Sequence, residues 1–295
     1  MVMKLSELYL YGRKVLSQTE DLQTAGMLAR NLLCHATGKT TQQIISEMDL
    51  YASQAVYEEF TTAVKRVAEG EPIAYVLGEW DFFGMTLQVT KDVLIPRDDT
   101  CAVAELAIKY GLFLEKAPRI LDLCTGSGCI GLAIASRIQD ARVTLADISK
   151  EAIAVAKRNV AGQKLTSRVS CVIANALGAP EPFLGKFDMI VSNPPYITTA
   201  EMKSLPDSVK NFEPHLALHG GSDGLDFYRN IAHEYAAALK PNGLLCFEFG
   251  IHQGDDICQI LEDAGFSVLE RTNDYNNVER AVIARLERKD VSYGN

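Results

Sequence analysis

The chain has 295 residues, of which 47% are hydrophobic and 23% are charged, which is the balance of a globular protein rather than of a disordered or fibrous one. Asp and Glu outnumber Lys and Arg by 38 to 29, giving a net charge of -9. This acidity argues against a general nucleic-acid binder, because neutralising phosphates requires a basic surface.

The seven cysteines are scattered, odd in number and without a CxxC pair. They indicate a reducing compartment and predict neither a disulfide framework nor a metal site. The first residues lack the apolar core and cleavage site of a signal peptide, and no apolar run approaches a membrane span. We therefore expect a cytoplasmic protein that is not bound to a membrane.

Apolar residues at helical spacing predict a small helical bundle as an N-terminal domain over residues 1–72. In residues 73–96 the helical spacing of apolar residues gives way to short apolar segments separated by glycines. Short segments at 73–78, 80–84 and 86–89 predict strands around a Gly turn, and so a β-hairpin linker.

From residue 97 onward, strands and helices alternate, which is typical of a parallel sheet with crossover helices. We expect an α/β domain with a Rossmann-like, mostly parallel seven-stranded sheet over 97–288, followed by a tail at 289–295. A helix is predicted at 225–239, closed by residues 240–243. The predicted strands are 119–123, 141–147, 168–173, 187–192, 244–249, 266–269 and 281–286.

A Gly-rich turn follows the first of these strands, where Gly126 and Gly128 let backbone amides approach a ligand at the start of a helix. With Gly131 they also satisfy GxGxxG, so NAD binding is an alternative at this point. Asp147, at the end of the second strand, is placed to accept hydrogen bonds from two ribose hydroxyls. Asp122 would repel a pyrophosphate but suits the ammonium and sulfonium groups of S-adenosylmethionine.

The sequence Asn-Pro-Pro-Tyr at 193–196 ends the fourth strand. Two prolines without N–H groups make a stiff loop that presents carbonyl acceptors. The side-chain amide of Asn193 and the flat face of Tyr196 suit holding a planar amide or amino group while its nitrogen is methylated. The acceptors would be the Asn193 side-chain oxygen and the Pro194 carbonyl.

The Gly-rich loop, the distal acidic residue and Asn-Pro-Pro-Tyr together resemble the class I methyltransferases, which use S-adenosylmethionine and release S-adenosylhomocysteine. The expected substrate and catalytic residues are Asn193, Pro194, Pro195 and Tyr196. The expected cofactor residues are Asp122, Cys124, Thr125, Gly126, Gly128, Asp147, Ile148, Asn175, Ala176 and Asn193.

Flanking segments at 95–100, 212–214 and 220–225 narrow the resemblance to the peptide-chain release factor glutamine methyltransferases, the HemK or PrmC family. This resemblance covers nearly the whole chain. It implies methylation of N5 of the glutamine in the Gly-Gly-Gln loop of release factors 1 and 2. It also implies an N-terminal domain that docks the release factor, and we expect a monomer without stable nucleic acid.

Four positions depart from the family pattern. Asp98 replaces Pro, Cys101 replaces Glu, Cys124 stands where many methyltransferases have Gly, and Asn175 replaces an Asp near the adenine. The carbonyl oxygen of Asn175 can still accept a hydrogen bond.

Three other functions remain as alternatives. A ribosomal-protein glutamine methyltransferase would share the reaction, although Asp99-Thr100 favours the release factor branch. An adenine-N6 methyltransferase would stack a base on the tyrosine, but it predicts a basic groove that this acidic chain does not indicate. A non-enzymatic cofactor-binding module would not need the Asn-Pro-Pro-Tyr sequence.

Overall fold

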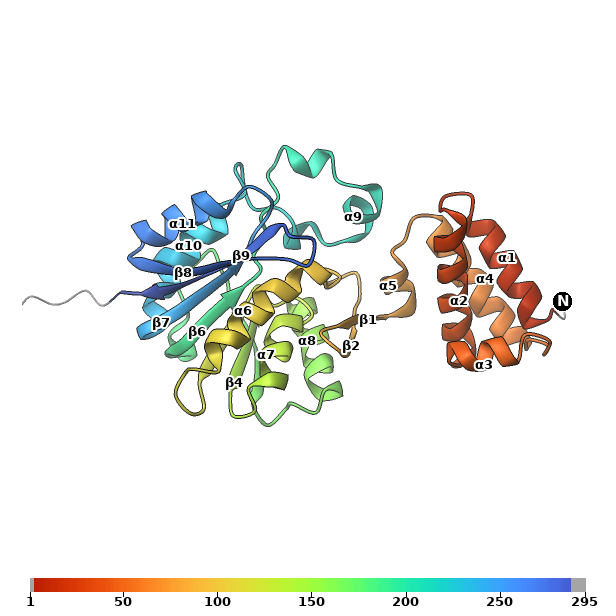
Figure 1. Ribbon diagram of the computed structural model, residues 1–295, viewed down its shortest axis with the longest axis horizontal. Coiled ribbons are helices and arrows are strands. Elements are labelled where there is room, and N and C mark those ends of the chain that lie inside the picture. Colours follow the sequence, from red (N-terminus) through yellow and green to blue (C-terminus); the bar gives the residue numbers. More distant parts are fainter. Residues whose placement is uncertain (1–2, 288–295) are drawn as a thin grey trace, which may run out of the picture. The chain divides into compact units, whose positions relative to one another are not determined.

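The structure is a computed structural model, and it describes residues 3–287. Its contacts divide the chain into two compact units (Figure 1). One comprises Met1–Glu79 with Asp207–Phe212, and the other comprises Trp80–Pro206 with Glu213–Asn295. Residue 288 and the predicted tail at 289–295 lie outside the described residues.

The first unit is helical, as predicted. Its longer elements are α1 (Leu5–Leu16), α2 (Leu22–Thr37), α3 (Thr41–Ser46) and α4 (Gln54–Ala68), and α9 (Asp207–Phe212) also belongs to it. Asp21 begins α2 by accepting two backbone N–H groups of its first turn, and Gly38 ends it with a φ of +66°. Leu8, Leu32 and Phe60 are fully buried in its core, so the apolar faces of the helices meet one another.

The predicted strand at 73–78 is wrong, because these residues form helix α5 (Ile73–Leu77). Pro72 precedes the first turn, where its missing N–H interrupts no helical hydrogen bond. Gly78, with a φ of +75°, ends the helix. A short apolar run has the same pattern in a buried strand and in a buried helical turn, so periodicity alone does not separate the two.

The other two strands of the predicted hairpin are confirmed as β1 (Glu79–Phe82) and β2 (Met85–Gln88), which form a two-stranded sheet. Phe83 and Gly84 join them with φ values of +53° and +76°. Positive φ at both central residues is typical of the tight turn whose twist matches that of a hairpin.

The second unit contains the predicted seven-stranded sheet, with the order β5-β4-β3-β6-β7-β9-β8. Its strands are β3 (Arg119–Leu123), β4 (Arg142–Asp147), β5 (Val169–Ile173), β6 (Phe187–Ser192), β7 (Leu239–Glu248), β8 (Phe266–Asn273) and β9 (Glu279–Leu286). The first five are parallel, and β9 runs antiparallel to β7 and β8. The α/β fold class is therefore confirmed.

Helices cover both faces of this sheet (Figure 1). They are α6 (Cys101–Gly111), α7 (Cys129–Arg137), α8 (Lys150–Gly162), α10 (Asp226–Glu234) and α11 (Gly254–Asp263). Successive residues of β3 point to opposite sides, so Ile120 packs with α6, α7 and α8 while Leu121 packs with α10 and α11. Two apolar cores thus hold the sheet in place.

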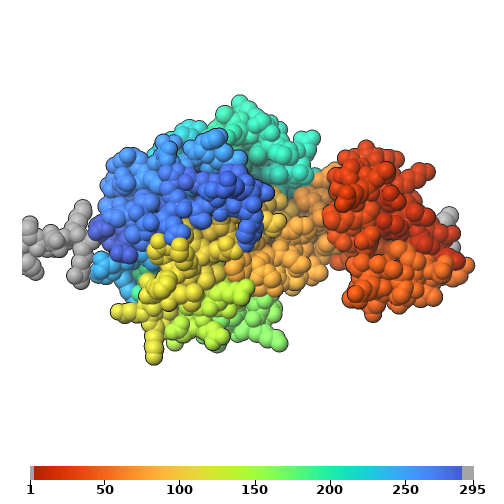
Figure 2. All heavy atoms as spheres, in the orientation of Figure 1, coloured from red at the N-terminus to blue at the C-terminus, as the bar shows by residue number. Residues whose placement is uncertain are grey.

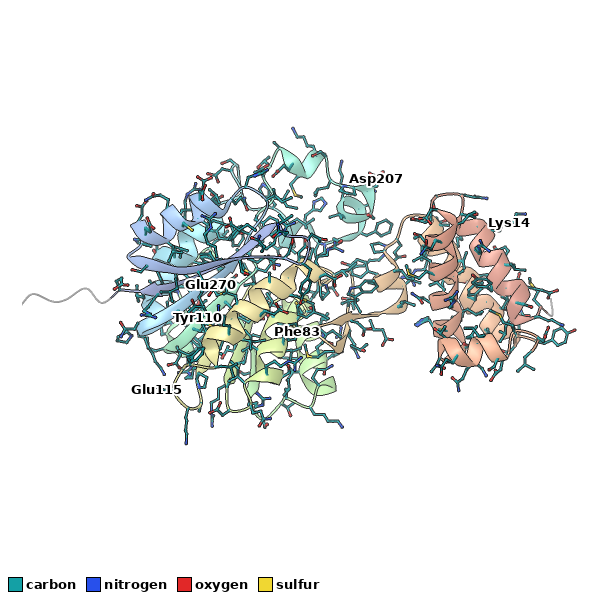
Figure 3. The ribbon with its side chains drawn as sticks, in the orientation of Figure 1. Lys14, Phe83, Tyr110, Glu115, Asp207 and Glu270 are labelled. Atoms are coloured by element: carbon teal, nitrogen blue, oxygen red, sulfur yellow. The ribbon has the colours of Figure 1, made fainter. Side chains whose placement is uncertain are left out.

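Helix α6 is also tied to the C-terminal strands. In Figure 2 its atoms lie beside those of the last strands, and in Figure 3 Tyr110 points toward Glu270 of β8. The Tyr110 hydroxyl donates to Glu270 at 3.0 Å, and the Lys109 ammonium donates to the same carboxylate at 2.6 Å. These contacts fix α6, and with it the segment that enters the site from residue 95.

The predicted helix at 225–239 is shorter than expected. Helix α10 ends at Glu234, a 3-10 turn (Tyr235–Ala238) follows, and β7 already begins at Leu239. The Pro-Asn-Gly segment at 241–243 lies inside β7, where the pairing with β6 is irregular. Among residues 3–287, the helices are all too short or too polar to cross a membrane.

Candidate active site

Three adjacent strands end at one edge of the sheet. The order β4-β3-β6 places β3 in the middle, and Leu123 pairs with Ala146 on one side and with Ser192 on the other. After β3 the chain forms β4 and β5 on one side of it, and it then crosses to form β6 on the other side. Ligands bind at such a switch point in open α/β sheets.

The loop after β3 has an unusual backbone. Cys124, Gly126 and Gly128 have φ values of +61°, +53° and +87°. Glycine adopts such values without strain, whereas a residue with a Cβ does so at a cost of about 1–2 kcal/mol. This explains why glycine suits position 124. Despite its side chain, Cys124 lets the loop turn back into the N-terminus of α7.

Asp122 supports this loop from beneath. It is fully buried, and its Oδ2 accepts hydrogen bonds from the Thr125 hydroxyl at 2.6 Å and from the Gly131 N–H at 2.9 Å. Its Oδ1 has no hydrogen-bond partner in the described structure. A Cβ at Gly131 would lie 2.9 Å from the carboxylate and 2.2 Å from Leu145, so only glycine permits this approach.

Burial raises the pKa of Asp122 to about 7, and hydrogen bonds from Thr125 and Gly131 oppose part of the increase. The folded state therefore keeps a proton that the unfolded chain loses near its ordinary pKa of about 3.9. The contribution of the protonated Asp122 carboxyl to the free energy of unfolding is fully present below its ordinary pKa, and it is lost as the pH rises towards 7. A displacement of one pH unit in a pKa corresponds to about 1.4 kcal/mol.

We expect Asp122→Asn to reduce this pH dependence, since the amide keeps an acceptor but cannot ionise. Urea unfolding at pH 5 and pH 8, followed by the fluorescence of the single tryptophan, Trp80, reports on the second unit. The wild type should lose more unfolding free energy between the two pH values than the variant. The exposed Asp140, changed to Asn as a control, should behave as the wild type. Equal losses in wild type and Asp122→Asn would contradict the expectation.

Asp147 ends β4 and joins two parts of the site. Its Oδ2 accepts the N–H of Gly126 at 2.9 Å, and its Oδ1 accepts the N–H of Ser149 at 3.0 Å. Burial raises its pKa, and these backbone donors oppose the change. Each oxygen keeps further acceptor capacity for a ligand hydroxyl.

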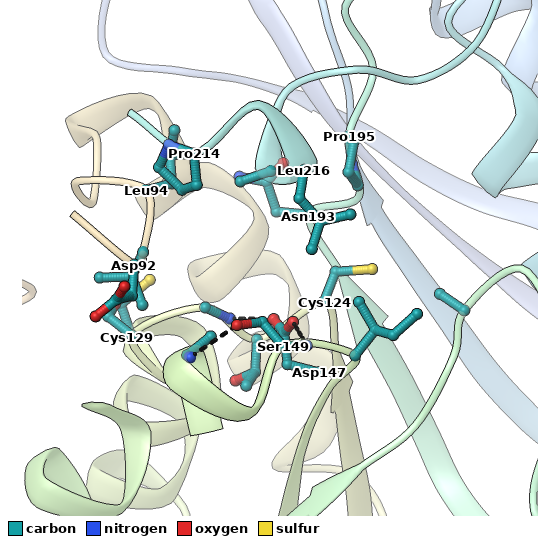
Figure 4. A pocket seen from close by; sticks show the side chains of 18 of the residues that line it. Asp92, Leu94, Cys124, Cys129, Asp147, Ser149, Asn193, Pro195, Pro214 and Leu216 are labelled. Atoms are coloured by element: carbon teal, nitrogen blue, oxygen red, sulfur yellow. Dashed lines mark hydrogen bonds between the residues drawn. The ribbon is translucent and has the colours of Figure 1, made fainter. Parts of the chain in front are cut away.

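A cavity of about 390 Å³ lies over the strand ends, within the usual range of small-molecule sites. Figure 4 shows Asp147 and Ser149 on one side of it and Asn193 and Pro195 on the other. The sequence-predicted residues that line the cavity are Cys124, Thr125, Gly126, Asp147, Ile148, Asn175, Ala176, Asn193 and Pro195.

Four predicted site residues do not line this cavity: Asp122, Gly128, Pro194 and Tyr196. Asp122 accepts hydrogen bonds from the loop, and its direct contact with a cofactor stays a prediction. Gly128 is the buried residue before α7, with Leu145 only 3.0 Å from where its Cβ would lie. Their effect on the cavity is therefore indirect.

Tyr196 also lies away from the cavity wall. It packs beside Gly250, where an added Cβ would be 3.0 Å from the ring, and its carbonyl accepts the Gln253 amide at 3.1 Å. Burial raises its pKa. The role of Tyr196 in holding the flat face of a substrate amide stays a prediction.

Several residues that line the cavity belong to no sequence motif, or were indicated only by the family resemblance. Leu94, Ile130, Leu216 and Phe227 add apolar surface. Leu94 lies in a loop and the other three in helices or a 3-10 turn, and a single apolar residue in such a place gives no sequence signal of a binding site. Arg97 lines the cavity and forms an ion pair with the buried Glu213. This pair holds together the flanking segments on which the resemblance was based.

The four departures from the family pattern have different surroundings. Asn175 is exposed at the cavity, and its Oδ1 accepts the N–H of Leu177 at 3.0 Å. Asp98 begins a 3-10 turn, and Cys101 is buried at the start of α6, where burial raises its pKa to about 11.

Within residues 3–287, no three His, Cys, Asp or Glu side chains are grouped to hold a metal ion.

Comparisons with known proteins agree with this architecture. The model of the PrmC N-terminal domain matches residues 7–78, and that of the methyltransferase small domain matches residues 110–212. A release factor glutamine methyltransferase of Clostridium acetobutylicum is 36% identical over 282 residues, 96% of this chain and 98% of the relative. Another, of Agrobacterium fabrum, is 34% identical over 92% of this chain and 96% of the relative.

A solved structure, that of a methyltransferase from Pyrococcus furiosus, is similar in fold. It is 19% identical, with a TM-score of 0.50, and the likeness covers 77% of this chain and 100% of that one. The relatives from Clostridium acetobutylicum and Agrobacterium fabrum both exceed 30% identity and align over almost their whole lengths. The chain therefore belongs to the release factor glutamine methyltransferase family.

Proposed function

We propose that this protein transfers a methyl group from S-adenosylmethionine to N5 of the glutamine in the Gly-Gly-Gln loop of release factors 1 and 2. The observation that carries the proposal is the placement of Asp147 and Asn193 on opposite sides of one cavity. A ribose-binding carboxylate and an amide acceptor then face the same space, in a chain whose relatives are release factor glutamine methyltransferases.

The residues present fit the cofactor. Asp147 offers two carboxylate oxygens to the ribose hydroxyls. Ile148 and Leu177, both exposed hydrophobic residues that line the cavity, offer apolar contact for the adenine. Asn175 would accept from its amino group. The unpartnered Oδ1 of Asp122 leaves a buried acceptor beneath the loop.

S-Adenosylmethionine supplies a methyl group already activated by its sulfonium, so the protein's contribution is mainly alignment. Asn193 accepts one N–H of the substrate amide through its side-chain oxygen and fixes the nitrogen. The Pro194 carbonyl is the proposed second acceptor. Because Pro194 is buried outside the cavity wall, its use requires the loop to adjust when substrate binds, as often happens between free and substrate-bound enzymes. The proton leaves to water after transfer.

We further propose that the helical unit docks the release factor, and that the enzyme acts as a cytoplasmic monomer. Exposed apolar side chains are available on that unit, among them Leu22, Met27 and Tyr51. A protein partner of some size would cover such residues.

Labelled S-adenosylmethionine offered with a release factor, its Gln→Ala variant, ribosomal protein and DNA tests the proposal. Label is expected on the release factor and not on its Gln→Ala variant. Label on ribosomal protein in preference to the release factor would favour the related glutamine methyltransferase. Label on DNA, or undiminished label on the Gln→Ala variant, would overturn the proposal.

A further inference from the structure

Glu248 is a buried carboxyl group at the end of β7, beside Asn193. Ser192, the last residue of β6, pairs with Phe247 of β7, so the residues that follow each of them leave the sheet at the same edge. Glu248 is 3% exposed and does not line the cavity. It therefore lies next to Asn193 in the sheet but outside the cavity wall.

The backbone of Glu248 is held firmly. Its carbonyl oxygen accepts the Tyr228 hydroxyl at 2.9 Å, and it pairs with Ala281 of β9. Tyr228 itself is fully buried, with its ring edge-on to Phe247. A side chain on so fixed a backbone, with no exposed space around it, has few orientations available.

The groups around the carboxyl come from several elements. Burial raises the pKa of Glu248 to about 8, while hydrogen bonding by Thr100 and Asn193 and the charge of Arg280 lower it in part. Asp99 acts in the opposite direction. Arg280 is itself paired with Asp99 at 3.1 Å and with Asp274 at 3.0 Å. No ion pair with Glu248 is found in the described structure, and its Oε2 has no hydrogen-bond partner.

The register of the strand ends places Asn193 next to Glu248, because each directly follows a member of the Ser192–Phe247 pair. The buried Oε2 of Glu248 has no hydrogen-bond partner in the described structure, and in an asparagine side chain only the amide nitrogen can donate to such an oxygen. If the nitrogen is directed at Glu248, the oxygen is left for the cavity. A substrate amide can be held through its N–H only by that oxygen, so a rotated Asn193 would present the wrong group.

We propose that Glu248 is a positioning residue that sets the orientation of the Asn193 side-chain amide, with the nitrogen turned to Glu248 and the oxygen turned to the substrate. This inference rests on the proposed function for its consequence in catalysis. It predicts that Glu248 affects turnover more than cofactor binding, because the residues proposed to hold the ribose and the adenine, Asp147 and Asn175, lie at the ends of β4 and β5.

Glu248→Met keeps the size of the side chain and removes its acceptors. It is expected to lower kcat on a release factor by about 10- to 100-fold, as for other residues that orient a ligand-contacting group. Glu248→Gln keeps one acceptor and should stay within about 3-fold of the wild type. The dissociation constant of S-adenosylhomocysteine should be unchanged in both variants.

A double-mutant cycle separates positioning from a general structural effect. When Asn193 is already alanine, adding Glu248→Met should change the remaining rate by less than about 2-fold. An equal loss in both backgrounds, or a wild-type rate for Glu248→Met alone, would overturn the inference. So would weaker cofactor binding that accounts for the loss.

If Glu248→Met does not fold, the side-chain N–H resonances of Asn193 in ¹⁵N-labelled protein provide the test. They are assigned by their absence in Asn193→Ala. They should shift in Glu248→Gln, and no shift would overturn the inference. This measurement needs no substrate, so it remains decisive even if the wild type fails to label a release factor, a result that would contradict only the proposed function.

Discussion

An Asn193→Ala variant is expected to methylate a release factor about 100-fold more slowly than the wild type at saturating cofactor and substrate. The reason is that alanine removes the side-chain oxygen that accepts the substrate N–H, and single preorganised hydrogen-bonding groups in active sites are worth about 10²–10³ in kcat. Initial rates with labelled S-adenosylmethionine measure the effect. The loss should appear in kcat, since the contact aligns the nitrogen with the methyl group.

Asn276 provides a matched control. It is an exposed asparagine in the turn after β8, and it is not among the cavity-lining residues. Asn276→Ala should keep the wild-type rate. Because Asn193 also lies where the cofactor would bind, its alanine variant needs a separate calorimetric measurement of cofactor affinity. A kcat for Asn193→Ala within about 3-fold of the wild type would show that the proposed role is wrong.

The sequence predicted the sheet well because its strands are continuous apolar runs that end at polar residues. Strand β6, for example, was placed at 187–192, as observed. Segment 73–78 was misread because a five-residue apolar run contains too little periodicity to distinguish strand from helix. The early start of β7 was missed because Pro241 and Gly243 usually interrupt a strand, whereas an irregular pairing accommodates them here.

The site was predicted in part for a similar reason. Asp147 and Asn193 follow strands, and the parallel topology brings such residues to one edge. Whether a side chain faces the cavity depends on packing from distant segments. Asp122 is turned under the loop by Thr125 and Gly131. For Glu248, the one available signal is a charged residue in the apolar run 244–249.

Among the variants considered for the cavity, Asp147→Ala should produce the largest loss of affinity for S-adenosylmethionine. The proposed hydrogen bonds from two ribose hydroxyls to a carboxylate are worth about 1.5 kcal/mol each, so the dissociation constant should rise by about 100-fold. The variant also removes the acceptor for the Gly126 N–H, which loosens the Gly-rich loop. Isothermal titration calorimetry with S-adenosylmethionine measures the change.

The matched control is Asp140→Ala, since Asp140 is exposed just before the opposite end of the same strand, where it accepts the N–H of Ala117 at 2.9 Å. It should bind cofactor as the wild type does. S-Adenosylhomocysteine distinguishes the cause of the loss in Asp147→Ala, because it has the ribose but lacks the sulfonium charge. Equal losses for both ligands are expected from a ribose contact. A loss confined to S-adenosylmethionine would instead assign Asp147 to charge attraction, and a dissociation constant within about 3-fold of the wild type would remove it from the cofactor site.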